Sequence, residues 1–234
     1  MSDIIFKVVI DTAFNNNIVK LDKVSYNKTI DVQFGIYQEH PCKGMLTVSL
    51  KPSHGWKDWL INIDCLPMST EFGSAHSGYM AELKKYMDDL FKRMEGYLKD
   101  IAKEYGQADG IILAGRSKGA AEAELLVPYV KRAFNPAYLY LGAFEPPKCC
   151  SNEYKKNIEK SLFNKGWLTC WHNDIVPGLV PWFKHGGELM QFGKRKLGLS
   201  IKDHEKSTTE EEIWYEEYDN MIKEKEKTDG TRPA

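Results

Sequence analysis

The stretch ILAGRSKGAAEA, residues 112–123, decides the fold because it places a serine between a strand and a helix. The apolar run that ends at Ala114 predicts a buried strand, and the two alanines after the turn begin a helix. Gly115 and Gly119 frame Ser117. A sharp strand-to-helix turn holds a serine clear of the backbone and crowds the residues two before and two after it, so both favour glycine. The pattern predicts that Ser117 is a nucleophile, with an ordinary helix-capping serine as the alternative.

Outward from this turn, apolar segments alternate with segments of helical periodicity. Segments rich in β-branched or aromatic residues predict strands over 4–10, 30–37, 45–50, 111–114, 138–141 and 167–171. Helices are expected over 77–105, from Ser117 toward Phe134 with a kink or interruption at Pro128, over 152–162, and from Ser207 onward. This alternation predicts the α/β class, with a mainly parallel central sheet and helices on both faces. In such sheets, sites form at the carboxyl ends of the strands.

A serine on such a turn needs an acid and then a histidine later in the chain. Asp174 follows the strand at 167–171, although an aspartate that starts a turn toward Pro177 would look the same. Two histidines come later, His185 and His204. His204 is favoured, since it precedes Ser207-Thr208-Thr209-Glu210, which has the form of a capping box and would leave the histidine in a loop. A solvated surface histidine is the alternative for His204.

Composition limits the function classes. The 234 residues fit one domain, 1–234, in which 223–234 is expected to be a flexible tail. A net charge of -1 gives no general attraction to nucleic acid or to an anionic membrane, and no apolar run is long enough for a membrane span. The start MSDIIFKVVID lacks a signal-peptide pattern, so the expected location is the cytoplasm, or outside the cell by export without a cleavable signal.

Cysteine and histidine spacing predicts neither a metal nor a cofactor. The five cysteines match no zinc pattern, and the histidines lack helical i, i+4 pairing with carboxylates. Adjacent cysteines form a strained disulfide, so Cys149 and Cys150 are expected to be reduced thiols.

Four stretches together resemble the class 3, fungal-type triacylglycerol lipases, a branch of the α/β-hydrolases. They are LTVSLKPSHGWKDWLINID, AHSGYMAELKKY, IILAGRSKGAAEAELL and CWHNDIVPGLVPWFKHGGE, and the resemblance spans roughly Met45 to His204. It implies Ser117 as nucleophile, Asp174 as acid and His204 as base. It also implies an oxyanion hole formed by the backbone amides of Ser53 and Lys118.

Some positions depart from the family pattern. Pro52 stands where a glycine usually precedes the oxyanion residue, and Arg116 and Lys118 flank the serine in place of histidine and leucine. The segment GAFEPPKCC, residues 142–150, replaces the family's Gly-x-Pro-Arg-x-Gly-Asn and receives no role. Trp56, Trp59 and Leu60 are candidates for a lid or an acyl groove, or else anchor a packed helix.

The expected function is that of a serine carboxylester hydrolase, a lipase or phospholipase, that acts on a lipid ester through an acyl-enzyme. A lipid–water interface is a candidate place for this reaction. Arg116 and Lys118 raise the hypothesis of a phosphate-bearing lipid, against the alternative of two solvated cations. A catalytically impaired binding module and a hydrolase of non-lipid acyl groups are the competing interpretations. Nothing in the sequence indicates the oligomeric state.

Overall fold

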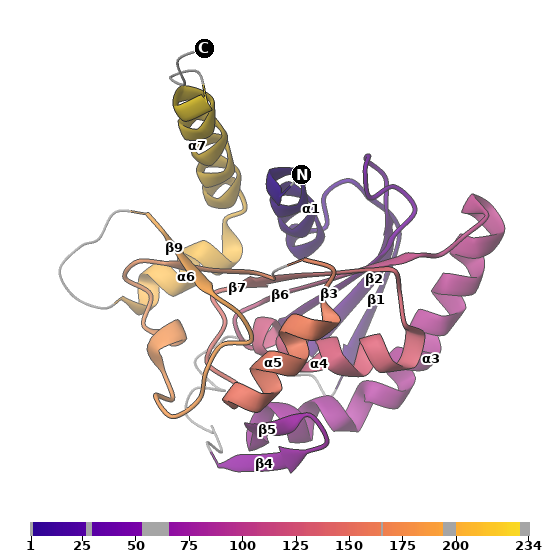
Figure 1. The fold of residues 1–234 in the computed structure, drawn as a ribbon, viewed down its shortest axis with the longest axis horizontal. Coiled ribbons are helices and arrows are strands. Elements are labelled where there is room, and N and C mark those ends of the chain that lie inside the picture. Colours follow the sequence, from indigo (N-terminus) through magenta and orange to yellow (C-terminus); the bar gives the residue numbers. More distant parts are fainter. Residues whose placement is uncertain (1, 27–29, 53–65, 165, 194–199, 230–234) are drawn as a thin grey trace.

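The central sheet has seven strands in the order β1-β2-β3-β6-β7-β8-β9 (Figure 1). The structure, a computed structural model, describes residues 2–26, 30–52, 66–164, 166–193 and 200–229. Strands β3, β6, β7, β8 and β9 pair in parallel, whereas β1 and β2 add an antiparallel edge. The prediction of a mainly parallel sheet is therefore confirmed.

The described elements have the following bounds. The strands are β1 Ile18–Tyr26, β2 Ile30–Tyr37, β3 Leu46–Pro52, β4 Pro67–Thr70, β5 Gly73–His76, β6 Gly110–Arg116, β7 Tyr138–Phe144, β8 Trp167–Trp171 and β9 Leu189–Phe192. The helices are α1 Ser2–Phe14, α3 Ser77–Tyr105, α4 Lys118–Phe134, α5 Asn152–Ser161, the 3-10 turn η1 Val176–Gly178, α6 Ile201–Thr209 and α7 Glu212–Asp229. β4 and β5 form a separate antiparallel hairpin.

Helices cover both faces of the sheet, as predicted. Figure 1 shows α1 and α7 on one side and α3, α4 and α5 on the other. Successive side chains of a strand point to opposite faces, so Ile111 and Leu113 of β6 join the core under α3 and α4, while Ile112 and Ala114 join the core under α1. Apolar side chains on both faces of β6 hold the strand that leads to Ser117.

The segment predicted as a strand over 4–10 is wrong, because it forms helix α1. Its β-branched residues resemble a strand, but Phe6, Val9 and Ala13 recur at helical spacing and are all fully buried against the sheet. Burial of this face outweighs the low helix propensity of valine and isoleucine.

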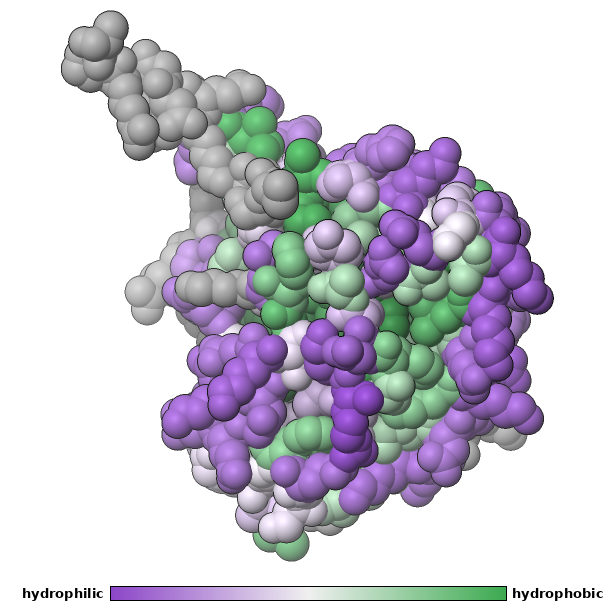
Figure 2. Space-filling view, turned by 45° about the vertical axis from the view of Figure 1, so that its right-hand side comes forward, coloured by the Kyte–Doolittle hydropathy of each residue, from purple (hydrophilic) through white to green (hydrophobic). Residues whose placement is uncertain are grey.

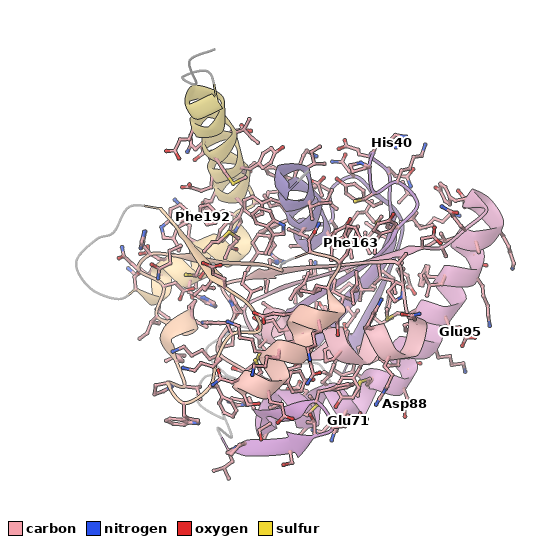
Figure 3. All side chains as sticks on the ribbon, in the orientation of Figure 1. His40, Glu71, Asp88, Glu95, Phe163 and Phe192 are labelled. Carbon is pink, nitrogen blue, oxygen red and sulfur yellow. The ribbon has the colours of Figure 1, made fainter. Side chains whose placement is uncertain are left out.

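The two helices that flank the serine agree with the sequence, apart from Pro128. α3 ends at Tyr105, and the φ of 83° at the capping residue Gly106 allows its N–H to close the last turn on Ala102 O at 3.0 Å. Asp88 and Glu95 lie on the outer side of α3 (Figure 3). The predicted interruption of α4 is wrong, because the helix continues through Pro128 to Phe134. Pro128 is buried with the turns around it, so packing on both sides holds the helix together.

The C-terminal region differs from the prediction. Ser207 lies inside α6 rather than at the start of the last helix, and the N-cap is Ser200, whose hydroxyl accepts the Asp203 N–H. A second helix, α7, follows and places Trp214 fully buried against Phe144. α7 continues to Asp229, so the first part of the expected tail is helical; a flexible end remains a prediction.

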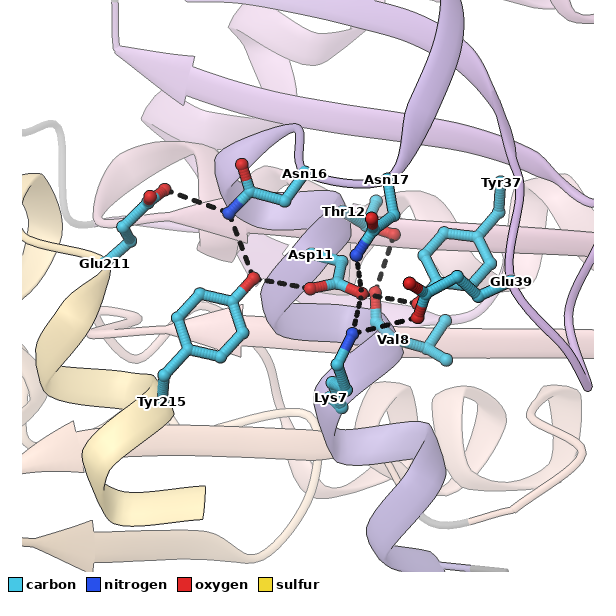
Figure 4. Close-up of polar contacts among 10 residues, drawn as sticks. All are labelled: Lys7, Val8, Asp11, Thr12, Asn16, Asn17, Tyr37, Glu39, Glu211 and Tyr215. Atoms are coloured by element: carbon cyan, nitrogen blue, oxygen red, sulfur yellow. Dashed lines mark hydrogen bonds and ion pairs between the residues drawn. The ribbon is translucent and has the colours of Figure 1, made fainter. Parts of the chain in front are cut away.

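A buried carboxylate joins the two ends of the chain. Asp11 of α1 is fully buried and accepts hydrogen bonds from the phenols of Tyr37 and Tyr215 and, at 2.9 Å, from Lys7 Nζ (Figure 4). Tyr215 belongs to α7, and its hydroxyl also accepts from Asn16 Nδ2 at 3.0 Å. These contacts attach α7 to α1 on one face of the sheet.

Polar side chains cover most of the face in Figure 2, and apolar side chains gather toward its middle. No helix in the described ranges is both long enough and apolar enough to cross a membrane.

Candidate active site

The turn between β6 and α4 holds Ser117 in an unusual backbone conformation. Its φ of 53° and ψ of -126° are sparsely populated for a residue with a side chain. The Ser117 N–H donates to Phe144 O at 2.8 Å, which ties the turn to the end of β7. A Cβ on Gly115 would overlap the carbonyl of Gly119, and a Cβ on Gly119 would overlap the carbonyl of Leu50. Both glycines are therefore required for the turn to close.

Three side chains from distant parts of the sequence form a continuous hydrogen-bonded relay. Ser117 Oγ lies 2.8 Å from His204 Nε2, and His204 Nδ1 lies 2.6 Å from Asp174 Oδ2. The Asp174 carboxylate accepts the hydrogen bond from Nδ1–H, so Nε2 carries the lone pair that accepts the hydrogen bond of the serine hydroxyl. Ser117, Asp174 and His204 are 1%, 6% and 0% exposed. Burial in a medium of low dielectric strengthens each of these contacts.

Backbone contacts hold the acid and the imidazole together. The Val176 N–H donates to Asp174 Oδ1 at 2.8 Å, and the Ser200 N–H donates to Asn173 O at 2.6 Å. Ser200 then caps α6, which carries His204 in its first turn. The expectation of a loop histidine is wrong: His204 is fixed on a helix whose start is joined to the acid loop.

The first residue of α4 supplies one candidate donor for an oxyanion. The first N–H groups of a helix have no acceptor within it, so the Lys118 amide is available beside Ser117. The other expected donor, Ser53, lies outside the described residues, as do Trp56, Trp59 and Leu60, the candidates for a lid or groove.

Of the two cations beside Ser117, Lys118 is buried and Arg116 is partly buried. Lys118 Nζ lies 2.6 Å from Glu82 and 3.7 Å from Glu122, and its side chain is 4% exposed. Arg116 stacks over the ring of Phe14 at 4.7 Å, and burial lowers its pKa to about 10. Neither is a solvated cation, and the ion pairs of Lys118 remove its support for a phosphate-bearing substrate.

The candidate His185 and two further described histidines do not take part in the relay. His185 Nε2 donates to Pro177 O at 3.1 Å, and burial followed by the charge of Lys148 lowers its pKa to about 4. His76 is fully buried and stacks on Tyr79 with a centroid separation of 4.2 Å. His40 lies in the loop after β2 (Figure 3).

A second carboxylate lies beside the relay. Glu145, fully buried, offers an oxygen that lies within 4.8 Å of the corresponding atoms of Asp174 and His204. Such a trio resembles a metal-binding set, but His204 Nδ1 and Asp174 Oδ2 are already joined to each other by a hydrogen bond. Glu124, Cys149 and Cys150 form another set of this kind. There, too, two members are joined by a hydrogen bond, since Cys149 Sγ donates to Glu124 Oε2 at 3.5 Å. The four described cysteines, Cys42, Cys149, Cys150 and Cys170, are free and buried.

The family model for class 3 lipases matches residues 47–184, which is more than half of the chain and runs from the second residue of β3 through the acid loop. The chain belongs to the class 3 lipase family. A secreted mono- and diacylglycerol lipase of Malassezia globosa is 24% identical over 171 residues, which cover 62% of this chain and 53% of that protein. This class 3 lipase chain therefore spans about half the length of the curated relative it matches.

Solved structures show the same fold. A lipase from Rhizopus microsporus var. chinensis superimposes with a TM-score of 0.62 at 14% identity, covering 76% of this chain and 62% of that one. A triacylglycerol lipase from Penicillium expansum gives a TM-score of 0.62 at 13% identity, covering 81% and 80%. The class 3 lipase chain thus has the α/β-hydrolase fold, as expected.

Sequence reasoning missed two residues at the site. Ser200 precedes Ile201 and stands three residues before Asp203, which is a capping signal. The similar run that begins at Ser207 competes with it, and the sequence prediction follows that later run. Glu145 follows β7 in a segment that matches no motif, so no pattern in the sequence points to it.

Proposed function

We propose that this class 3 lipase chain is a serine carboxylester hydrolase that acts on lipid esters. The single observation that carries the proposal is the relay from Ser117 Oγ through His204 to Asp174, built on a strained turn between strand and helix. A serine that only capped α4 would not need an imidazole at 2.8 Å and a carboxylate behind it.

The geometry supports an acyl-transfer sequence. Ser117 Oγ attacks the ester carbonyl carbon while His204 Nε2 takes its proton, and Asp174 stabilises the imidazolium that forms. The carbon–oxygen bond to the alcohol then breaks, and His204 returns the proton to the departing alcohol. Water, activated by the same imidazole, cleaves the acyl-enzyme and regenerates the serine hydroxyl.

The developing negative charge on the carbonyl oxygen needs donors. The Lys118 amide at the N-terminus of α4 points a dipole toward this oxygen. Ser53 is proposed as the second donor from the resemblance alone. Each donor contributes ~3 kcal/mol to lowering the barrier.

The class of substrate follows from the family and from the charge of the site. The Malassezia relative is named for mono- and diacylglycerols, and the buried ion pairs of Lys118 offer no free cation to a phosphate. We therefore favour a neutral glyceride over a phospholipid.

Replacement of the nucleophile tests the proposal. We expect Ser117→Ala to lower hydrolysis of an emulsified glyceride and of a short nitrophenyl ester by roughly 10⁴-fold or more, because no other group can form the acyl-enzyme. The measurement is steady-state turnover at neutral pH, with circular dichroism to verify the fold.

The matched control is Ser161→Ala. Ser161 ends α5 and its hydroxyl donates only to Asn157 O, so parental turnover is expected. Near-parental turnover in Ser117→Ala contradicts the mechanism. If the parent turns over no ester, a binding module on a lipase fold becomes the better account.

A further inference from the structure

We propose that Glu145 is a second acidic positioning residue, whose carboxylate acts together with Asp174 on the imidazole of His204. The inference rests on the proposed function, since it concerns the imidazole that activates Ser117. It assigns a role to the segment 142–150, in which this chain departs from the pattern it otherwise resembles.

The backbone around Glu145 is fixed in a conformation that points its side chain inward. Glu145 is the first residue after β7 and has a φ of 54°, which is uncommon for a residue with a side chain. Its N–H donates to Thr169 O at 2.8 Å. Its Oε1 accepts the N–H of Trp171 at 2.8 Å. Both contacts are to β8, the strand that leads into the loop of Asp174.

The position of Glu145 also connects it to the nucleophile. The preceding residue, Phe144, accepts the N–H of Ser117 through its carbonyl. Glu145 therefore lies between the turn that carries the hydroxyl and the loop that carries the acid. Its carboxylate oxygen lies within 4.8 Å of both Asp174 and the ring of His204.

Two carboxylates at this distance from one imidazole affect its charge. An opposite charge within about 4–6 Å favours the ionised form of a group, and the effect is large where water is excluded. Glu145 and His204 are both fully buried. When the ring accepts the proton of Ser117, an ionised Glu145 beside it stabilises the imidazolium further, and the imidazolium in turn favours the ionised carboxylate.

Groups from separate elements face this ring. Ser117 comes from the turn, Asp174 from the loop after β8 and Glu145 from the end of β7. Cys170 of β8 lies near both carboxylates: burial raises the pKa of its thiol to about 12, with smaller contributions from Glu145 and then Asp174. This thiol stays neutral, so the carboxylates set the charge around the imidazole.

The deciding experiment is a pH titration of the His204 ring by NMR in the full chain, with the His204 signal assigned by its loss in His204→Gln. Glu145→Gln retains a carbonyl oxygen for the Trp171 N–H and removes the charge. A carboxylate favours the protonated ring, so its removal should move the titration midpoint to lower pH.

Glu124→Gln is the matched control. Glu124 is also fully buried, and burial raises its pKa to about 8, so it is mainly neutral at pH 7 and its replacement removes little charge. The midpoint of this variant should match that of the parent. A Glu145→Gln midpoint that coincides with those of the parent and the control overturns the proposal, and this result does not depend on turnover.

A second variant covers the case in which Glu145→Gln does not fold. Where one acid serves alone, its conversion to the amide lowers turnover by about 10⁴-fold. With Glu145 in place, Asp174→Asn should retain at least about one hundredth of the parental turnover, and a loss of the full size contradicts the proposal. If the parent has no turnover, the proposed function is refuted. The ring titration of Asp174→Asn then still tests whether the acid and the imidazole pair, because this pairing predicts a titration midpoint lower than in the parent.

Discussion

At the scale of single residues, the site depends on backbone positions that tolerate almost no side chain. Ser117 has a positive φ, and the residues on either side of the turn approach other backbone atoms closely. Gly119 lies against the carbonyl of Leu50 on the neighbouring strand β3. The turn is therefore held between α4 and the sheet, and this contact fixes the position of the Ser117 hydroxyl relative to the sheet.

A methyl group at this contact should be costly. We expect Gly119→Ala to lower the free energy of unfolding by about 2 kcal/mol or more, because backbone atoms of two elements have to move apart. Gly96 in α3 has no neighbour within 4 Å of the position of a Cβ, so Gly96→Ala should instead raise it by about 1 kcal/mol. Urea unfolding of both variants checks this, and equal effects would contradict the geometry of the turn.

Site residues that belong to a sequence pattern can be predicted from the sequence. A site residue that reaches the site only through the folding of the chain cannot. Ser117 stands between glycines, and Asp174 and His204 follow it in the order expected for such a turn. Glu145 has no such signal, because its place beside His204 depends on its backbone conformation and on the pairing of β7 with β8.

At the scale of elements, the two chain termini stabilise one face of the sheet together. α1 packs against β6 and β7, and α7 joins it through the buried network around Asp11. Trp214 of α7 contacts Phe144, the residue before Glu145, so this face supports the end of β7. Loss of the Asp11 contacts should therefore lower the free energy of unfolding.

The phenol of Tyr215 tests this attachment. We expect Tyr215→Phe to lower the free energy of unfolding by about 1–2 kcal/mol, since a fully buried carboxylate loses a donor. Burial and Asp11 raise the pKa of Tyr215, so its contribution is present below pH ~10 and declines as the unfolded phenol ionises above that pH. Urea unfolding at pH 7 and pH 11 measures both effects.

Tyr138→Phe is the control for that measurement. Tyr138 is 37% exposed at the edge of β7, and its replacement should change the free energy of unfolding by less than about 0.5 kcal/mol. If the two variants behave alike at pH 7, the network around Asp11 does not attach α7.

The sequence predicts the boundaries of an element correctly where one signal is present. The prediction is wrong where two signals compete. α3 was located by its periodicity and by Gly106. Segment 4–10 combines β-branched residues with helical spacing, and contact with the sheet decided in favour of the helix. Near His204, two serines each precede an acidic residue, and the first one became the cap.

At the scale of the whole molecule, the parallel sheet brings distant residues to one edge. β6, β7 and β8 are neighbours, and their carboxyl ends present Ser117, Glu145 and, one short turn later, Asp174. His204 comes from α6, whose N-terminus pairs with the acid loop at the bridge between Asp174 and Ser200. The order of the strands therefore determines which side chains can meet.

The most direct test of the central claim, that His204 activates Ser117, is covalent labelling with a fluorophosphonate probe. We expect the intact chain to carry one adduct, located at Ser117 by mass spectrometry of its peptides, because only an activated hydroxyl displaces the fluoride at a useful rate. In His204→Gln the labelling rate should fall by about 100-fold or more. No adduct at Ser117 in the folded parent, or equal labelling rates with and without the imidazole, would contradict the account.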